Sequence, residues 1–551
     1  MKFPKPLSAV LVVAMLVTVT VVSIPADDTM KEVTLVDSPF YDSDMYKVSF
    51  EYSSGGQLDY RDVCYYTDEY FFTPSTSYDQ SLATASLCFA MSAFHSFKGK
   101  GYSNGSDNVE RFLKNTGFLD FEANEDFGRE PTTDSIGLAI ANKHIHDGEG
   151  DYTLIALAVR GSGYGAEWVE NFQIGTGDES YGHHEGFYNA MNRTLDFMES
   201  YIESKNITGD IKLWMTGYSR GAAVSNMVAG NIDTSIAFGE PVLGGDVSLA
   251  KEDMFAYTFG TPMGAHFDED SDHPDPRCEY YNNIWNIINR NDFIVKLAME
   301  ACDFCRYGND VALPDQRDSD YEELKEIMLE FYMSSDSIAN LEPYAIDEFV
   351  AYRLDLVSML SGGNPLIIDE SRVGDTQGDV LDSLVDNITN AIGGREGYVN
   401  KVQGGLCELL SDLYEYGSEY QINAFLQVMA YALMNMEGED GKALYITLAM
   451  DLLLSGPEDL ARNLHEPVEF GLRVCGITSD EALLQEKATR FSEILASLAF
   501  VLKDDILVDE DCVNDLVSLA VNFNTIAVAH YPESALSWLK CEDRNYIVSY
   551  E

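Results

Sequence analysis

One serine of this chain lies between two glycines, where a strand pattern changes into a helix pattern. In the stretch LWMTGYSRGAAVSNMVAG, Gly217, Ser219 and Gly221 form a GxSxG motif. A serine hydroxyl becomes a good nucleophile when it is held exposed beside a base, and a sharp turn between a buried strand and the next helix exposes it. Side chains at Gly217 and Gly221 would collide across that turn. We therefore predict a nucleophile at Ser219, with both glycines forming its elbow; an ordinary turn is the alternative.

The elements that would position this serine alternate between about residues 131 and 307. Apolar runs predict strands at 135–144, 152–161, 210–217, 254–260 and 283–289. The segment 185–202 predicts a helix, because its apolar side chains recur at steps of three and four. These side chains are Phe187, Ala190, Met191, Leu195, Met198 and Ile202. Near-continuous apolar strands separated by helices predict the α/β class, with a largely parallel sheet covered on both faces.

Five blocks of this sequence resemble, in the same order, those of the class 3 lipases, the fungal-lipase-like branch of the α/β-hydrolases. The blocks are ALAVRGSGYGAEWVENF, HHEGFYNAM, WMTGYSRGAAVSNMVA, YTFGTPMGA with NIINRNDFIVKL, and AVAHYPESALSWL. The resemblance covers roughly residues 80–300 and 520–540, and it implies an α/β-hydrolase core that cleaves carboxylic esters. Tyr218 and Arg220 depart from it, because the family more often has His and Leu beside the serine. The long stretch between the acid and histidine blocks is also unusual.

A serine hydrolase also needs a base and an acid that orients the base, and in α/β-hydrolases these follow the serine in the order acid, then histidine. Asp292 follows an apolar run and matches the family's acid; a turn aspartate is the other interpretation. Two histidines lie beyond it. His530 matches the family's histidine block, whereas His465 is expected on the surface of a helix end. His183 and His184 match a family position that is usually structural. We predict Asp292 as the acid and His530 as the base.

Acyl transfer further needs donors for the oxyanion, each contributing on the order of 3 kcal/mol. The backbone N–H of Arg220, the residue after the nucleophile, should be one donor. The resemblance implies Ser162 as the other, although Ser162 could be a simple turn residue. The stretch GYGAEWVENF that follows corresponds to the region where family members carry a lid. Trp168 in this stretch is either a lid aromatic or a packing residue, and the sequence leaves both interpretations open.

The N-terminus has the pattern of a secretory signal. Lys2 and Lys5 precede an apolar stretch from Leu7 to Val22, and small and acidic residues follow. We predict a signal peptide over residues 1–26, cleaved after Ala26, and a secreted or extracellular protein. An uncleaved membrane anchor is the alternative.

Composition restricts the possible partners. The chain has 551 residues, with 92 acidic and 35 basic side chains and a formal charge of −57, which repels polyanions and excludes nucleic acid as a partner. The charge favours a highly soluble secreted protein; adaptation to high salt and avoidance of anionic membranes are alternatives. Cys302 and Cys305 form a lone CxxC, which favours a local bridge or plain thiols over zinc. No metal and no cofactor is assigned.

Changes in sequence pattern along the chain divide the part after the signal into three segments. Residues 27–311 and 507–551 should form the hydrolase domain, and residues 312–506 should form a mostly helical insertion or cap. Long amphipathic segments fill this insertion, and their apolar stripes are expected to be core.

The function predicted from these features is a secreted serine carboxylic-ester hydrolase, a lipase or esterase that forms an acyl-enzyme intermediate. The predicted partners are an ester or lipid substrate and a transient contact with a lipid interface, and no obligate protein partner is inferred. Two alternatives stay open: a non-enzymatic secreted binding protein on the same fold, and an esterase, phospholipase or deacylase with another substrate than triacylglycerol.

Overall fold

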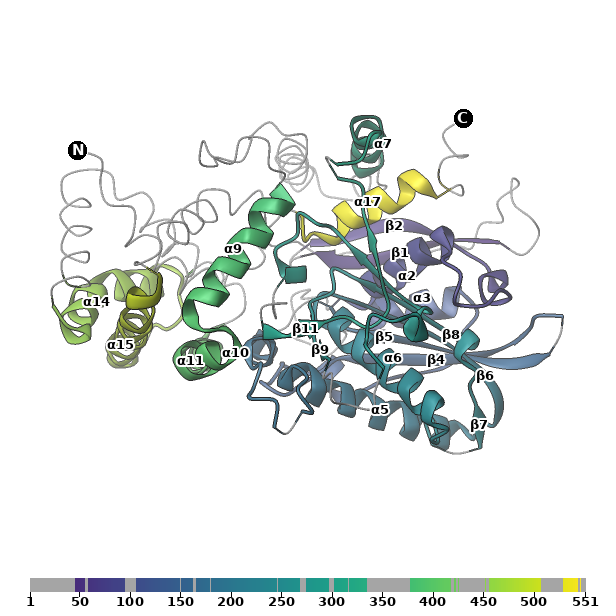
Figure 1. Ribbon diagram of the computed structural model, residues 1–551, viewed down its shortest axis with the longest axis horizontal. Coiled ribbons are helices and arrows are strands. Elements are labelled where there is room, and N and C mark those ends of the chain that lie inside the picture. Colours follow the sequence, from purple (N-terminus) through teal and green to yellow (C-terminus); the bar gives the residue numbers. More distant parts are fainter. Residues whose placement is uncertain are drawn as a thin grey trace.

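The structure is a computed structural model, shown in Figure 1. It describes residues 45–54, 58–94, 106–148, 150–161, 165–178, 180–244, 246–267, 274–296, 302–315, 317–333, 377–417, 421–422, 425, 451, 455–506, 529–543 and 546. The predicted signal peptide, residues 1–26, lies outside these ranges, as do most of the amphipathic segments at 422–436 and 443–454. Among the helices that the structure describes, none has the length and apolar character that crossing a membrane requires.

The fold is built on a central sheet that has eight strands in the described ranges. Seven of them follow the order β12, β10, β8, β6, β5, β4, β3, and the eighth, β7, pairs with β6. The strands from β12 to β5 are parallel, whereas β4 and β3 pair antiparallel. Their bounds are β3 Leu119–Ala123, β4 Leu138–His146, β5 Asp151–Val159, β6 Gly209–Tyr218, β7 Val247–Ser248, β8 Met254–Phe259, β10 Ile284–Ile288 and β12 Asn309–Ala312. The predicted α/β class and the five predicted strands are confirmed.

Helices cover both faces of this sheet because alternate residues of each strand point to opposite faces. In β5, Ile155, Leu157 and Val159 pack with α5 and α6, and the residues between them pack on the other face. The first face carries α5 (Glu185–Lys205) and α6 (Arg220–Phe238). The second face carries α2 (Gln80–Ser92), around which lie α3 (Asp107–Asn115), α17 (Pro532–Glu542) and the hairpin of β1 (Tyr46–Ser54) and β2 (Leu58–Tyr66). The sequence pattern did not predict this hairpin.

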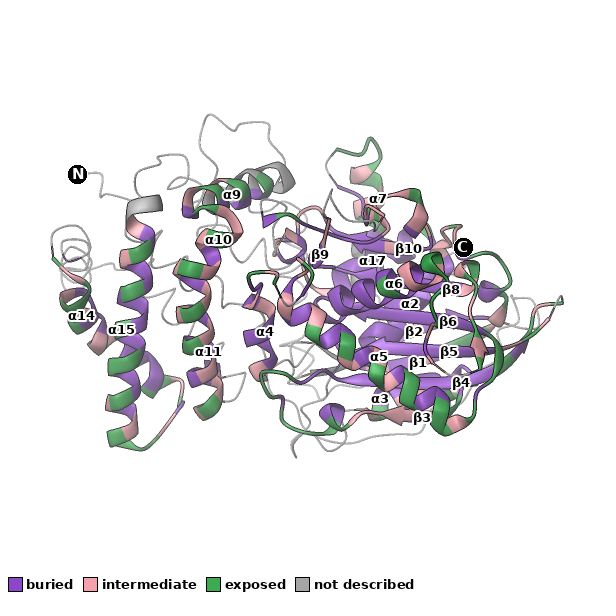
Figure 2. Ribbon diagram, turned by 60° about the horizontal axis from the view of Figure 1, so that its bottom comes forward, coloured by how far each residue is buried: buried purple, intermediate pink, exposed green. Residues whose placement is uncertain are grey.

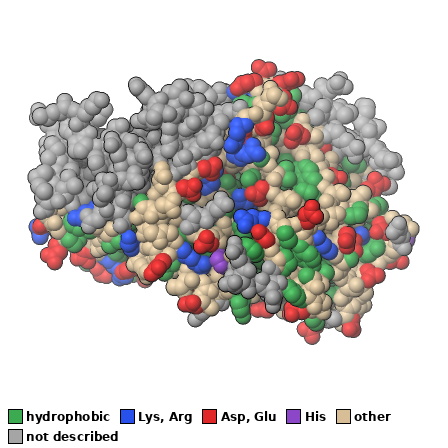
Figure 3. Space-filling model, in the orientation of Figure 1, with side chains coloured by type: hydrophobic (Ala, Val, Ile, Leu, Met, Phe, Trp, Pro, Cys, Tyr) green, Lys and Arg blue, Asp and Glu red, His purple; other side chains and the backbone are tan. Residues whose placement is uncertain are grey.

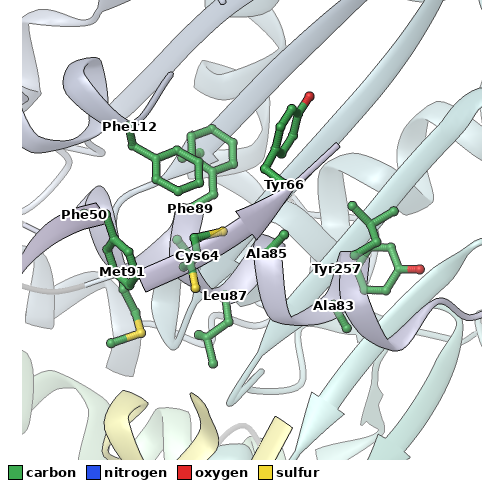
Figure 4. Packing of buried hydrophobic residues seen from close by; sticks show 14 of the residues in the cluster. Phe50, Cys64, Tyr66, Ala83, Ala85, Leu87, Phe89, Met91, Phe112 and Tyr257 are labelled. Carbon is green, nitrogen blue, oxygen red and sulfur yellow. The ribbon is translucent and has the colours of Figure 1, made fainter. Parts of the chain in front are cut away.

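The second face holds a dense aromatic core. Figure 4 shows Phe89 of α2 and Phe112 of α3 side by side, and their rings stack with centroids 5.5 Å apart. Trp214 of β6 lies against Phe89, with ring centroids 4.7 Å apart, and its Nε1–H donates to Ser86 Oγ at 2.8 Å. Ring packing of this kind fixes α2 on the sheet, and α17 packs on α2 in turn.

Helix α5 shows how the predicted stripe is used. Five of its six predicted apolar residues are buried, and Leu195 is half-buried. The helix begins after His184, whose Nδ1 accepts from the backbone N–H of Phe187 at 3.3 Å, and it ends at Asn206, whose φ of 53° is left-handed. His184 is therefore an N-cap, in agreement with the structural role implied for this position.

The described helices between residues 312 and 506 pack in two different places. Helix α7 (Tyr321–Met333) lies against α17, and its Met328 and Phe331 belong to the core of the second sheet face. The later helices share a separate apolar cluster beside the core (Figure 1). They are α9 (Gln377–Ile392), α10 (Gly394–Tyr398), η11 (Val399–Gln403), α11 (Gly404–Tyr416), α14 (Pro457–Val474) and α15 (Glu481–Ile506). Buried and exposed residues alternate along α11 and α15 in Figure 2, as expected for amphipathic helices.

Acidic side chains are spread over the visible surface rather than gathered into one patch, and basic side chains lie among them (Figure 3).

Candidate active site

Ser219 occupies the sharp turn between β6 and α6, with φ 55° and ψ −124°. Such a conformation costs a non-glycine residue about 1–3 kcal/mol and persists where the surroundings enforce it. A Cβ at position 217 would lie 2.2 Å from the carbonyl oxygen of Gly221, and one at position 221 would lie 2.4 Å from that of Val159. Only glycine fits at either position, which is the physical reason for the GxSxG spacing.

Three residues from distant parts of the chain meet at this turn. The Nε2 of His530 lies 2.9 Å from Ser219 Oγ, and its Nδ1 lies 2.6 Å from Asp292 Oδ2. Asp292 is buried, and its Oδ1 accepts from the backbone N–H of Ile294 at 2.8 Å. A proton on Nδ1 is held by the carboxylate, so that Nε2 can accept the serine proton.

Residues 156–301 match the family model of the class 3 lipases. The match contains Ser219 and Asp292 but ends before His530. It confirms the resemblance found in the sequence and supports a lipase-type hydrolase activity. No curated protein matches the chain.

Gly260 is a site residue that the sequence reasoning missed. It follows β8 in the lipase segment and has a φ of 57°. A Cβ here would lie 3.2 Å from His530 Cε1 and 3.5 Å from Asp292 Oδ2, so glycine leaves room for the pair. A glycine directly after an apolar strand, in YTFGTP, was the available signal.

The oxyanion side is formed by the start of α6 and the end of β5. Arg220 is the first residue of α6, where the helix N-terminus carries a partial positive charge beside Ser219. Ser162, the other candidate donor, lies outside the described residues. Gly161 precedes it, and a Cβ there would lie 2.4 Å from the carbonyl oxygen of Tyr218. The end of β5 thus approaches the elbow closely.

Buried ion pairs hold the segment that follows in the lipase match, η4 (Gly165–Glu167) and α4 (Trp168–Phe172). The guanidinium of Arg220 pairs with Glu170, and that carboxylate also accepts from Arg193 at 3.0 Å. Next to this group, Arg160 pairs with Glu167, and neither side chain is exposed to solvent.

Glu167 also accepts from Ser135 Oγ at 2.8 Å. Burial raises the pKa of Glu167, and the positive charges of Arg160 and Arg220 offset only part of that rise. The two buried arginines thus join the strand end and the elbow to η4 and α4.

Trp168 is a packing residue in this structure. It is 9% exposed and stacks with Phe172, in the apolar cluster of the later helices. The hydroxyl of Tyr398 donates to the Phe172 carbonyl at 3.1 Å. α4 is therefore covered by α11 and its neighbours.

Two of the later helices, α9 and α10, bind segments that lie next to the site. The guanidinium of Arg395 in α10 donates to four backbone carbonyls between α4 and α5, at 2.5 to 3.1 Å. These belong to Ile174, Gly175, Gly182 and His183. On the other side, Asp382 of α9 pairs with Lys296, four residues after Asp292.

The remaining histidine candidates lie away from Ser219. The expected helix end for His465 is wrong: it lies in the middle of α14, with its ring nitrogen 4.0 Å from Glu469. His184 is fully buried, which lowers its pKa to about 3, and it caps α5. Within the described ranges, no group of three or more His, Cys, Asp or Glu side chains is arranged to hold a metal ion.

Proposed function

We propose that the protein is a secreted serine carboxylic-ester hydrolase that works through an acyl-enzyme intermediate. The observation that carries this proposal is the His530 ring, which bridges Ser219 Oγ and Asp292 Oδ2 at 2.9 and 2.6 Å. Ser219 attacks the ester carbonyl while Nε2 of His530 takes its proton. The carboxylate of Asp292 stabilises the imidazolium that forms.

The tetrahedral intermediate then collapses. The proton on Nε2 passes to the departing alkoxide, and the acyl group remains on Ser219. Water attacks this ester with His530 again as the base, and the carboxylic acid leaves. The N–H of Arg220 and, by resemblance, Ser162 hold the oxyanion in both steps.

The proposed substrate is an ester with a lipid or other acyl chain, as the class 3 lipase match suggests. We further propose that the helices from α9 to α15 cap the site, because they contact α4 and the segment after Asp292. Hydrolysis of p-nitrophenyl esters of increasing chain length, compared with hydrolysis of emulsified triacylglycerol, tests both the substrate class and the cap. A rate that does not depend on acyl length would contradict the cap.

Export is proposed from the N-terminal pattern of Lys2, Lys5 and the apolar stretch after them. A mature protein beginning at Asp27 would support it, and an intact Met1 on the exported protein would argue for an anchor instead.

The test of the nucleophile is labelling with a fluorophosphonate, which reacts with activated serines. Ser219→Ala should abolish labelling, because no other hydroxyl is bonded to His530 Nε2 among the described residues. Ser225→Ala is the matched control, since Ser225 is a buried serine of α6, six residues after Ser219, whose hydroxyl donates to the Thr216 carbonyl. Persistent labelling of Ser219→Ala would overturn the proposal.

A further inference from the structure

The main chain at His530 is held by two side chains that the catalytic scheme does not use. The hydroxyl of Tyr218 donates to the carbonyl oxygen of His530, and Nδ2 of Asn289 donates to that of Ala529 at 3.2 Å. Tyr218 directly precedes Ser219, and Asn289 lies three residues before Asp292. Each of the two loops that carry the other members of the triad therefore also binds the histidine segment.

We propose that Tyr218 is a positioning residue for His530, an inference that rests on the hydrolase function proposed above. Its hydroxyl bonds to the residue whose ring must meet Ser219 Oγ and Asp292 Oδ2 at once. The elbow then sets the place of the base as well as that of the nucleophile. A histidine or another residue at position 218 that lacks this reach would leave the base to be positioned by other contacts.

The surroundings of Tyr218 make this contact rigid. The side chain is buried, its ring lies edge-on to Phe94 with centroids 5.7 Å apart, and its centroid lies 5.3 Å from that of His530. A hydrogen bond in such a setting has little water to replace it, and loss of the donor leaves a carbonyl without that partner.

Further contacts of this segment lie along α17. Gln80 Nε2 donates to the Leu539 carbonyl at 2.9 Å, and Lys540 pairs with Asp62 at 2.7 Å. These contacts dock the helix on α2 and the hairpin, nine or more residues after His530. They fix the direction of the segment, whereas the Tyr218 hydroxyl fixes the residue that carries the base.

Tyr218→Phe removes this hydroxyl and keeps the ring packing. We expect kcat to fall roughly 10-fold with KM unchanged, since a base displaced by about 1 Å can cost roughly 100-fold and the ring contacts retain part of the placement. The rate of fluorophosphonate labelling should fall by the same factor. Rates are expressed per titrated Ser219, so a loss of folded protein does not enter.

Tyr280→Phe is the matched control, because Tyr280 also donates its hydroxyl to a backbone carbonyl, that of Asp233 at 2.9 Å, in the second half of α6. It should leave kcat unchanged. A kcat for Tyr218→Phe equal to that of the unchanged protein, or a change confined to KM, would overturn the positioning role. If the unchanged protein itself failed to label at Ser219, the hydrolase function would be at fault instead.

Discussion

The two residues beside Ser219 reach two different parts of the molecule by different kinds of interaction. On the α4 side, Arg220 is held to Glu170 by a buried ion pair, next to the pair of Arg160 and Glu167. On the histidine side, Tyr218 bonds to the main chain of His530 through a neutral hydroxyl. Within three residues, the elbow therefore makes an ionic contact on one side and a neutral hydrogen bond on the other.

The two kinds of interaction should affect different properties: the ion pair affects the free energy of unfolding, and the hydrogen bond affects the position of His530. Removing one partner of a buried ion pair typically costs about 3–5 kcal/mol, because the remaining charge stays in the interior. Removing one neutral hydrogen bond costs about 0.5–1.5 kcal/mol. Changes on the α4 side should therefore lower the free energy of unfolding most, whereas changes on the histidine side should mainly slow catalysis.

The largest effect is expected for Glu170→Gln. The variant keeps the shape of the side chain but leaves the guanidinium of Arg220, which is 1% exposed, without its carboxylate. The free energy of unfolding, measured with denaturant, should fall by about 3–5 kcal/mol. Glu408→Gln is the control, because its pair with Arg490 is half exposed and should contribute less than about 1 kcal/mol.

The double variant Glu170→Met with Arg220→Leu sharpens this test. It replaces both charges by apolar side chains, and a buried ion pair replaced in this way is often neutral in stability. Most of the loss should be recovered, and Arg193, whose side chain is 34% exposed, can then be solvated. If Glu170→Gln alone kept the full free energy of unfolding, the buried ion pair would not be what stabilises the α4 side.

Local pattern accounts for what the sequence predicted well. The elbow was predictable because the strand, the two glycines and the helix are adjacent in the chain, and the collisions at positions 217 and 221 lie within that stretch or against β5. Asp292 and His530 were predicted from the order of the family's sequence blocks rather than from a local pattern. In the structure, the ring of His530 lies between Ser219 Oγ and Asp292 Oδ2.

Contacts between distant residues were not predictable in the same way. Tyr218 and Arg220 stood out as departures from the family, but their partners lie 312 and 50 residues away. A single sequence does not indicate which carboxylate a buried arginine will meet. The hairpin of β1 and β2 was also missed, and its place against α2 depends on tertiary packing.

A second effect on the α4 side should depend on pH. His184 is buried, with its Nε2 3.2 Å from the Asn171 carbonyl of α4, and its pKa in the folded protein is lowered to about 3. The unfolded chain takes up this proton near pH 6.5, so stability that is fully present above pH 6.5 is lost as the pH falls toward 3. The loss reaches about 2 kcal/mol at pH 5, at 1.36 kcal/mol for each pKa unit.

His184→Asn should reduce that dependence, because asparagine can cap α5 and does not titrate. Between pH 7.5 and pH 5 the variant should lose about 2 kcal/mol less unfolding free energy than the unchanged protein. Denaturant curves at both values measure the difference. Parallel losses in the two proteins would show that the acid sensitivity of this side has another source.

The smallest effect is expected on the histidine side, for Asn289→Ala. The variant loses the bond to the Ala529 carbonyl and the bond that Asn289 Oδ1 accepts from the Asn291 N–H at 3.0 Å. Unfolding free energy should fall by about 1 kcal/mol, with kcat per titrated Ser219 lower by about 3-fold. The effect on kcat should be smaller than that of Tyr218→Phe, because the bond reaches the residue before His530. If Asn289→Ala destabilised the protein as much as Glu170→Gln while its kcat stayed intact, the histidine side would be a structural support like the α4 side.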